Sequence, residues 1–352
     1  MNNKTQTKHK FFYSSQSEGG GENWIDWMKT IGMFFIIWGH LSPNILKSFI
    51  YAFSVPSFFM ISGYLFKASD WTSFFKKNFK GIIVPYFLLG FSVVLFFAVV
   101  KLYFGGYEKD YFPLSIFALL IGNQNGIGSG IGSQALWFVY TLFLLKVLCN
   151  CLRTNYIAQT VTAILCLVVA YVLNKNGLNL YSSWVNVLLA YPFFYIGFYI
   201  KNRFGTSINE FSIKSKNPYR AMALLIIGSC LLFALADVND MIEMYNAKFG
   251  NDILLFIADG FIGTVLLAIC SMLFGNKNSL GIINNLSKGT IIVLAWQIVF
   301  LLMIDLMMAR ILGCFLHNDV VTFIMACVIY IVFVPIIKFI KLHFPFLVGY
   351  RR

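Results

Sequence analysis

The sequence predicts an all-α, polytopic integral membrane protein with about ten transmembrane helices and both termini in the cytosol. Of its 352 residues 59% are hydrophobic and only 12% are charged, and its mean hydropathy is +0.75. Soluble domains carry about a quarter charged residues, so a soluble fold could not bury this much apolar surface. The apolar residues also gather in runs of about 20, the length at which a helix crosses a hydrocarbon core of ~30 Å.

Ten apolar segments satisfy this length rule or come close to it. The polar connections between them are short, so none is long enough to fold as a second domain. We therefore expect a mobile cytosolic tail at residues 1–22, which are polar and glycine-rich, and a single transmembrane domain over residues 23–352. The expected spans are 24–42, 46–66, 81–104, 135–152, 156–173, 184–200, 220–237, 253–274, 289–309 and 319–340.

The basic residues predict the orientation of these spans. With the N-terminus in the cytosol, 19 of the 27 Lys and Arg residues fall on the cytosolic side and six fall on the opposite side. Cytosolic loops carry the excess of basic residues in membrane proteins, so this bias supports ten spans with both termini cytosolic. The longest outer segment, about 105–134, contains an apolar stretch at 114–121 that is too short to span, and we expect it to be re-entrant or to lie on the membrane surface.

The formal net charge of +13 does not indicate nucleic-acid binding, because the basic residues sit in short loops between apolar spans. They are better interpreted as topology signals and as ligands for a phosphorylated cosubstrate. The seven cysteines lie in or beside apolar spans, and none has metal-ligand spacing with histidine partners. We therefore expect neither nucleic acid nor a metal ion as a partner.

The first expected span carries ionisable residues on one face. Lys29 and His40 have ten residues between them, so a helix places them within roughly 20° of one face and about 16 Å apart along its axis. Asp26 falls near the same face. An ionisable group inside a bilayer is costly, and by default it marks a functional site.

Several motifs in this chain resemble those of the membrane-bound acyltransferase-3 family, which includes the fucose 4-O-acetylase-like bacterial enzymes. The first span has Asp26, a basic residue, ten further residues and then His40, and the second span continues with Pro56 and the Ser62-Gly63-Tyr64 run. Weaker similarities are Phe75-Lys76-Lys77 leading to Pro85-Tyr86, Ala135-Leu-Trp137-Phe138, Tyr191-Pro-Phe-Phe-Tyr-Ile-Gly197 and Leu286-Ser-Lys-Gly-Thr290. Two residues depart from the family pattern: Lys29 stands where many members have Arg, and Gln297 stands where many have a second His.

The resemblance implies transfer of an acyl group, usually acetyl, from a cytosolic coenzyme A thioester to a hydroxyl of an extracytoplasmic or lipid-linked glycan. It implies a multi-pass protein of the bacterial plasma membrane, in contact with membrane lipids. Acetyl-coenzyme A or another acyl-coenzyme A would be a cosubstrate, and we expect no bound cofactor.

Within this chemistry His40, Lys29 and Asp26 are the candidate catalytic residues. The unperturbed pKa of histidine, near 6.5, suits removal of a proton from a hydroxyl, and the imidazole could instead accept the acyl group itself. The alternative is a buried histidine that is hydrogen-bonded between helices. Lys29 would bind a coenzyme A phosphate, or it would pair with Asp26 and reach the cytosolic interface.

Lys76, Lys77, Lys80 and Tyr64 are the candidate cosubstrate-binding residues. Lysines beside a cavity mouth suit nucleotide phosphates, although topology alone also explains them. Tyr64 could donate a hydrogen bond or could be an interfacial tyrosine, and its neighbour Gly63 is expected to let helices approach closely. Trp137 and Gln297 are the candidate acceptor-binding residues, and Trp137 is either a stacking surface for sugar or an outer aromatic-belt residue.

Two other functions remain open at this point. A transporter or flippase for a lipid-linked saccharide would usually show internal repeats, and no second copy of the Asp26-x-x-Lys29-x10-His40 pattern is present. A non-catalytic assembly partner is the third possibility.

Overall fold

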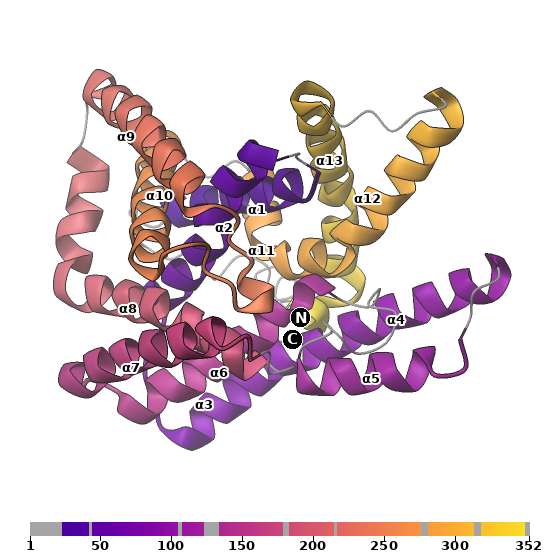
Figure 1. The fold of residues 1–352 in the computed structure, drawn as a ribbon, viewed down its shortest axis with the longest axis horizontal. Helices are drawn as coiled ribbons and strands as arrows, with labels where there is room; N and C mark the ends of the chain where they lie inside the picture. The colour runs from indigo at the N-terminus through magenta and orange to yellow at the C-terminus, as the bar shows by residue number, and fades with distance from the viewer. Residues whose placement is uncertain are drawn as a thin grey trace, which may run out of the picture.

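A computed structural model describes residues 23–41, 44–104, 108–122, 134–178, 183–214, 217–275, 281–312 and 318–348; the expected tail at 1–22 lies outside them. The described residues form a helical bundle and contain no β-structure beyond one isolated bridge between Glu243 and Lys248 (Figure 1). The helices are α1 (Asn23–Leu41), α2 (Asn44–Tyr64), α3 (Trp71–Asn78), α4 (Val84–Phe104), α5 (Tyr111–Ile121), α6 (Trp137–Leu152), α7 (Tyr156–Lys175), α8 (Ser183–Lys214), α9 (Pro218–Asn239), α10 (Ile253–Gly275), α11 (Gly281–Lys288), α12 (Thr290–Leu312) and α13 (Asp319–His343).

Each of the ten expected spans overlaps a helix, although α8 continues to Lys214, well beyond the expected end at 200. In the described part of the chain, seven helical stretches are long and apolar enough to cross a membrane, and these are Trp71–Phe104, Tyr156–Lys175, Ser183–Ile208, Pro218–Asn239, Ile253–Gly275, Thr290–Arg310 and Asp319–His343. The expected multi-pass helical class is thereby confirmed. α1, α2 and α6 are less apolar or shorter, so the number of ten spans and the cytosolic termini stay predictions.

The helix expected at 81–104 begins earlier than the hydropathy indicated. α3 continues through a π-helical segment (Phe79–Ile83) directly into α4. The side chain of Asp70 caps α3 by accepting a hydrogen bond of 2.8 Å from the backbone N–H of Ser73, and this bond holds the pKa of Asp70 below its usual value. The basic residues Lys76, Lys77 and Lys80 therefore lie on an ordered helical entry.

The apolar stretch in the long outer segment forms a helix of its own. α5 has 11 residues, about 16 Å, so it is too short to cross the bilayer. It packs against α4, where the hydroxyl of Tyr86 donates a hydrogen bond of 2.7 Å to the carbonyl oxygen of Leu119. A Cβ on Gly90 would overlap the Leu119 side chain, so glycine at this position brings the two helices together.

α1 and α2 lie at the centre of the bundle, with α10, α8 and α13 around them (Figure 1). The contact between α2 and α8 depends on two glycines: a Cβ on Gly63 would overlap the backbone of Phe194, and a Cβ on Gly197 would overlap the backbone of Met60. The expectation that Gly63 permits a close helix approach is confirmed. Small residues allow such contacts between apolar helices, where hydrophobic burial provides little driving force.

Hydrogen bonds fix α1 at several levels along its length. The Ser287 hydroxyl donates to Asp26 Oδ1 at 2.5 Å, and the Tyr330 hydroxyl donates to the carbonyl oxygen of Thr30 at 2.8 Å. Nearer the other end, Trp38 Nε1–H donates to Thr322 Oγ1 at 3.3 Å. These bonds to α11 and α13 set both the depth and the rotation of α1, and they therefore set the position of His40.

Candidate functional site

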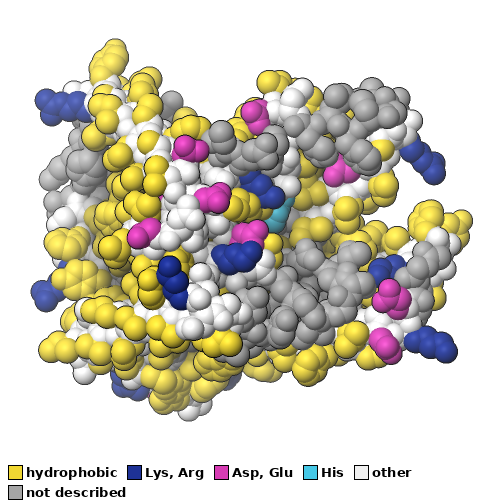
Figure 2. All heavy atoms as spheres, in the orientation of Figure 1, with side chains coloured by type: hydrophobic (Ala, Val, Ile, Leu, Met, Phe, Trp, Pro, Cys, Tyr) yellow, Lys and Arg dark blue, Asp and Glu magenta, His cyan; other side chains and the backbone are white. Residues whose placement is uncertain are grey.

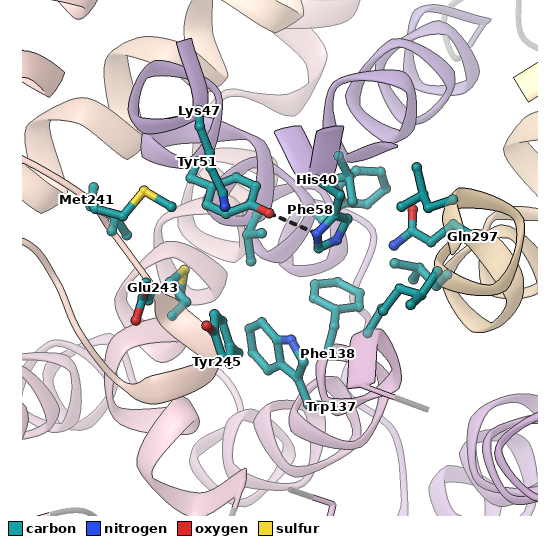
Figure 3. A pocket seen from close by; sticks show the side chains of 18 of the residues that line it. His40, Lys47, Tyr51, Phe58, Trp137, Phe138, Met241, Glu243, Tyr245 and Gln297 are labelled. Carbon is teal, nitrogen blue, oxygen red and sulfur yellow. Dashed lines mark hydrogen bonds between the residues drawn. The ribbon is translucent and has the colours of Figure 1, made fainter. Parts of the chain in front are cut away.

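A cavity of about 440 Å³ opens where the C-terminal end of α1 meets the beginnings of α2 and α6 (Figure 3). Its wall is completed by α12 and by the segment that follows α9. The volume falls within the usual range for small-molecule sites, about 300–1,000 Å³. Its polar and aromatic lining includes His40, Lys47, Tyr51, Phe58, Trp137, Phe138, Glu243, Tyr245, Gln297 and Asp305.

His40 is the penultimate residue of α1, and its side chain is exposed to this cavity. Its Nδ1 atom is hydrogen-bonded to the hydroxyl of Tyr51 on α2, at 2.9 Å. Gly39 makes room for this pair, because a Cβ there would lie 2.7 Å from Cε1 of Tyr51. The imidazole is thus oriented by a neighbouring helix and is not held as a fully buried structural histidine.

The bond to Tyr51 occupies Nδ1 of His40 and leaves Nε2 as the nitrogen available to a ligand. A neutral imidazole carries one proton, so when Nδ1–H donates to the Tyr51 oxygen, Nε2 has a free lone pair. That tautomer can remove a proton or attack an acyl carbon. The hydrogen bond to Tyr51 consequently influences which chemistry His40 can perform.

Charged side chains surround the cavity. Lys47 Nζ lies 5.7 Å from the centre of the Tyr51 ring, and Glu243 lies 3.3 Å from Lys248 in an ion pair. Figure 2 shows acidic and basic side chains gathered on this face of the molecule around a visible histidine. Burial raises the pKa of Tyr245, and the nearby Glu243 carboxylate raises it further, so this phenol stays protonated at neutral pH. The cavity therefore offers donors and acceptors suited to a polar, hydroxyl-rich ligand.

Aromatic rings form part of the cavity wall (Figure 3). The rings of Phe58 and Phe138 meet edge to face with centroids 6.0 Å apart, and Trp137 packs edge to face on Phe138 at 6.3 Å. Trp137 is half-buried and lines the cavity.

α12 contributes one continuous stripe of residues to the cavity. Their spacing of three and four residues is that of one helix face. Gln297 and Asp305 are the polar members, and Gln297 is fully buried. The whole stripe is Leu294, Gln297, Ile298, Leu301, Leu302 and Asp305.

The other predicted site residues lie toward the opposite end of α1 and α2. Asp26 is bonded to Ser287, about 21 Å from His40 along the helix. Tyr64 is buried between the Trp24 ring, at 5.7 Å, and the Lys201 ammonium, at 4.6 Å. The structure thus brings together His40, Trp137 and Gln297, and it separates this group from Asp26, Lys29 and Tyr64.

Lys146 on α6 lies within electrostatic reach of two lysines that come from other helices. The charge of Lys146 on α6 is opposed by those of Lys77 on α3 and Lys29 on α1. Lys146 and Lys29 are half-buried, whereas Lys76, Lys77 and Lys80 are exposed. We call Lys29, Lys77 and Lys146 the lysine group.

Sequence reasoning did not single out Tyr51 and Lys47, and it recognised Asp305 and Lys146 only as ionisable residues in expected spans, without a role. Lys47 and Tyr51 are one turn apart at the start of an apolar helix, just across a short connection from His40. This proximity in the sequence could have indicated that they lie near His40. Lys146 and Asp305 are isolated charged residues within apolar helices. Among the described residues, no group of three or more His, Cys, Asp or Glu side chains is arranged to hold a metal ion.

The apolar helices define a multi-pass membrane protein, and the comparison with protein families defines its class. A family described as an acyltransferase domain, acyltransferase-3, matches residues 22–347. The chain belongs to this family and is an acyltransferase, as the motifs around Lys29 and His40 had indicated. Searches of curated proteins and of solved structures found no match.

Proposed function

We propose that this protein is a membrane-bound O-acyltransferase that moves an acyl group, most simply acetyl, from cytosolic acyl-coenzyme A to a hydroxyl of a cell-surface or lipid-linked glycan. His40 acts as the general base or as the acyl acceptor, and the protein works in the plasma membrane of a bacterium. The acyltransferase family supports the reaction class. The donor, the acceptor and the role of His40 are our inference.

One observation carries the proposal: an accessible imidazole, oriented by Tyr51, faces a cavity with aromatic and polar walls. Transfer to a hydroxyl needs a base within hydrogen-bond reach of that hydroxyl. Carbohydrates bind through hydrogen bonds to their hydroxyls and through contact with aromatic rings, and the cavity supplies Glu243, Asp305 and Trp137 for these contacts.

The lysine group supports a phosphate-bearing donor at the other end of the bundle. Coenzyme A carries several phosphate charges, and lysine is a common phosphate ligand. With the predicted orientation, this group faces the cytosol, where acyl-coenzyme A is made.

The acyl group must then cross the distance between the lysine group and the cavity at His40. Lys29 and His40 are eleven residues apart on α1, or about 16 Å. The pantetheine arm would lie along α1 and carry the thioester toward His40, so that only the acyl group passes to the acceptor.

Membrane vesicles test this proposal. Inside-out vesicles that contain the protein should transfer label from [14C]acetyl-coenzyme A, supplied on the cytosolic face, to endogenous glycan on the enclosed face. His40→Ala should lower transfer by about 10²–10⁴-fold, the usual contribution of a general base. His343→Ala is the matched control, because His343 is bonded to the Phe339 carbonyl on α13 and does not line the cavity.

Equal transfer by the wild type and a folded His40→Ala variant would contradict the role of His40. Passage of intact glycan across the vesicle membrane without any acylation would instead support a transporter.

A further inference from the structure

Gln297 is an unusual residue for its position. It lies on the cavity-facing stripe of α12, between apolar neighbours, and none of its side chain is exposed. Neither Nε2 nor Oε1 has a hydrogen-bond partner. Figure 3 shows its amide end pointing from α12 toward the His40 ring.

Such an amide requires a physical explanation. A buried donor or acceptor without a partner costs free energy, and the great majority of buried polar groups in proteins are paired. A leucine or methionine here would continue the apolar stripe without that cost. The terminal torsion of glutamine is broad, so the amide can turn to the cavity without a rotation of α12. A ligand in the cavity is therefore the natural partner of this amide.

The position of Gln297 along α12 indicates which part of a ligand it meets. Asp305 lies eight residues, about 12 Å, farther along the same stripe, toward the end of α12 at Leu312. Gln297 is closer to the end of α12 that begins at Thr290, the end from which the proposed donor would enter. The amide therefore lies between the route of the thioester and the imidazole.

We propose that the Gln297 Nε2–H group donates a hydrogen bond to the carbonyl oxygen of the acyl thioester and stabilises the oxyanion that forms there during transfer. This inference rests on the proposed acyltransferase reaction and adds a catalytic residue to it. A neutral amide donor in a wall of Leu294, Ile298 and Leu301 is well suited to the task, because hydrogen bonds to a developing charge are stronger where water is excluded.

In the general-base form of the reaction, Nε2 of His40 removes the proton of the acceptor hydroxyl as its oxygen attacks the carbonyl carbon. The carbonyl π electrons move to the oxygen, and the Gln297 amide binds this oxyanion. The carbonyl then re-forms, the C–S bond breaks, and the leaving thiolate takes the proton from the His40 imidazolium. The products are an ester and free coenzyme A, so atoms and charge balance.

A Gln297→Met variant tests the role of the amide, because methionine has a similar length and no donor. With [14C]acetyl-coenzyme A and vesicles that contain the full chain, we expect kcat to fall about 10²–10³-fold, the usual cost of removing one oxyanion donor. The KM for acetyl-coenzyme A should change less than threefold. Asn186→Leu is the matched control: Asn186 on α8 is also a buried amide with an unpaired Nδ2, but it does not line the cavity, and kcat should stay near the wild-type value.

A second measurement does not depend on turnover. Acetonyl-coenzyme A keeps a carbonyl group but cannot be cleaved, and propyl-coenzyme A lacks the carbonyl. The wild-type protein should bind acetonyl-coenzyme A roughly fivefold more tightly than propyl-coenzyme A, which is the effect of one hydrogen bond. This preference should vanish in Gln297→Met. If that variant does not fold, the comparison of the two analogues on the wild-type protein alone tests whether the carbonyl oxygen receives a hydrogen bond.

The outcomes separate the two proposals. If His40→Ala is inactive but Gln297→Met retains wild-type kcat, or if the wild type binds both analogues equally, the oxyanion role is overturned and the acyltransferase proposal stands. A Gln297→Met variant with normal kcat and a raised KM for the glycan alone would also overturn it, because Gln297 would then bind an acceptor hydroxyl. If wild-type vesicles transfer no acetyl group, the proposed function itself fails.

Discussion

The hydroxyl of Tyr51 lies 2.9 Å from Nδ1 of His40, and the two residues come from adjacent helices that meet beside the cavity. The contact exists because Gly39 lacks a side chain, so that the Tyr51 ring can lie against the end of α1. The imidazole of His40 is thus oriented by a residue that is separated from it by a turn of the chain.

Replacement of Tyr51 by Phe should reduce kcat by roughly three- to tenfold, because one neutral hydrogen bond that orients the imidazole is lost while the ring packing stays. Transfer of [14C]acetyl in vesicles measures the change. Tyr103→Phe, on an exposed ring at the end of α4, is the control. Unchanged turnover in Tyr51→Phe would show that Tyr51 does not influence His40 during the reaction.

Lys29→Arg should keep most of the activity, whereas Lys29→Met should lose it. Arginine retains the positive charge and can still bind phosphate or approach Asp26, but methionine cannot. Vesicle transfer at several concentrations of acetyl-coenzyme A measures both variants. Full activity in Lys29→Met would reduce Lys29 to an interfacial anchor.

Lys146→Met should raise the KM for acetyl-coenzyme A about tenfold with little change in kcat, because Lys146 would contact the phosphates and not the reacting atoms. Lys76→Met is the comparison, since Lys76 is exposed and is not among the lysines that act on Lys146. An equal response of the two variants would argue against a specific lysine group.

Gly63→Ala should destabilise the protein by about 1–3 kcal/mol, the range for overpacking a tight contact. The added Cβ would meet the Phe194 backbone, which cannot turn away as a flexible side chain could. Thermal unfolding of the purified protein in detergent measures the effect. Gly81→Ala should not destabilise the protein, because no atom lies within 4 Å of the position that its Cβ would take and alanine favours a helix more than glycine does.

The orientation can be tested by labelling single cysteines in a variant whose seven native cysteines have been replaced. An impermeant maleimide added to intact cells should label Lys248→Cys, in the segment after α9, and should not label Tyr219→Cys, at the start of that helix. Both side chains are exposed, so access differs only by the side of the membrane. The reverse pattern would overturn the predicted topology.

The sequence by itself determined the class of fold and the positions of its main helices. Hydropathy is a local property, and a span of about 20 apolar residues must form a helix because the bilayer offers its backbone no other partners. The same local reasoning placed Lys29 and His40 on one helix face, since only the helical repeat enters that argument. This local reasoning did not predict that the helix leading into α4 begins at Trp71. α3 is amphipathic, and its start is set by the cap at Asp70 and not by hydropathy.

Only the tertiary structure decided which residues share a site. Gln297 and His40 are 257 positions apart in the chain, and Lys29, Lys77 and Lys146 come from three separate helices. Their meeting depends on how helices rotate and approach, which close contacts such as Gly63 against Phe194 and hydrogen bonds such as Tyr330 to Thr30 control. These are interactions between distant segments, and a hydropathy pattern along one segment carries no information about them.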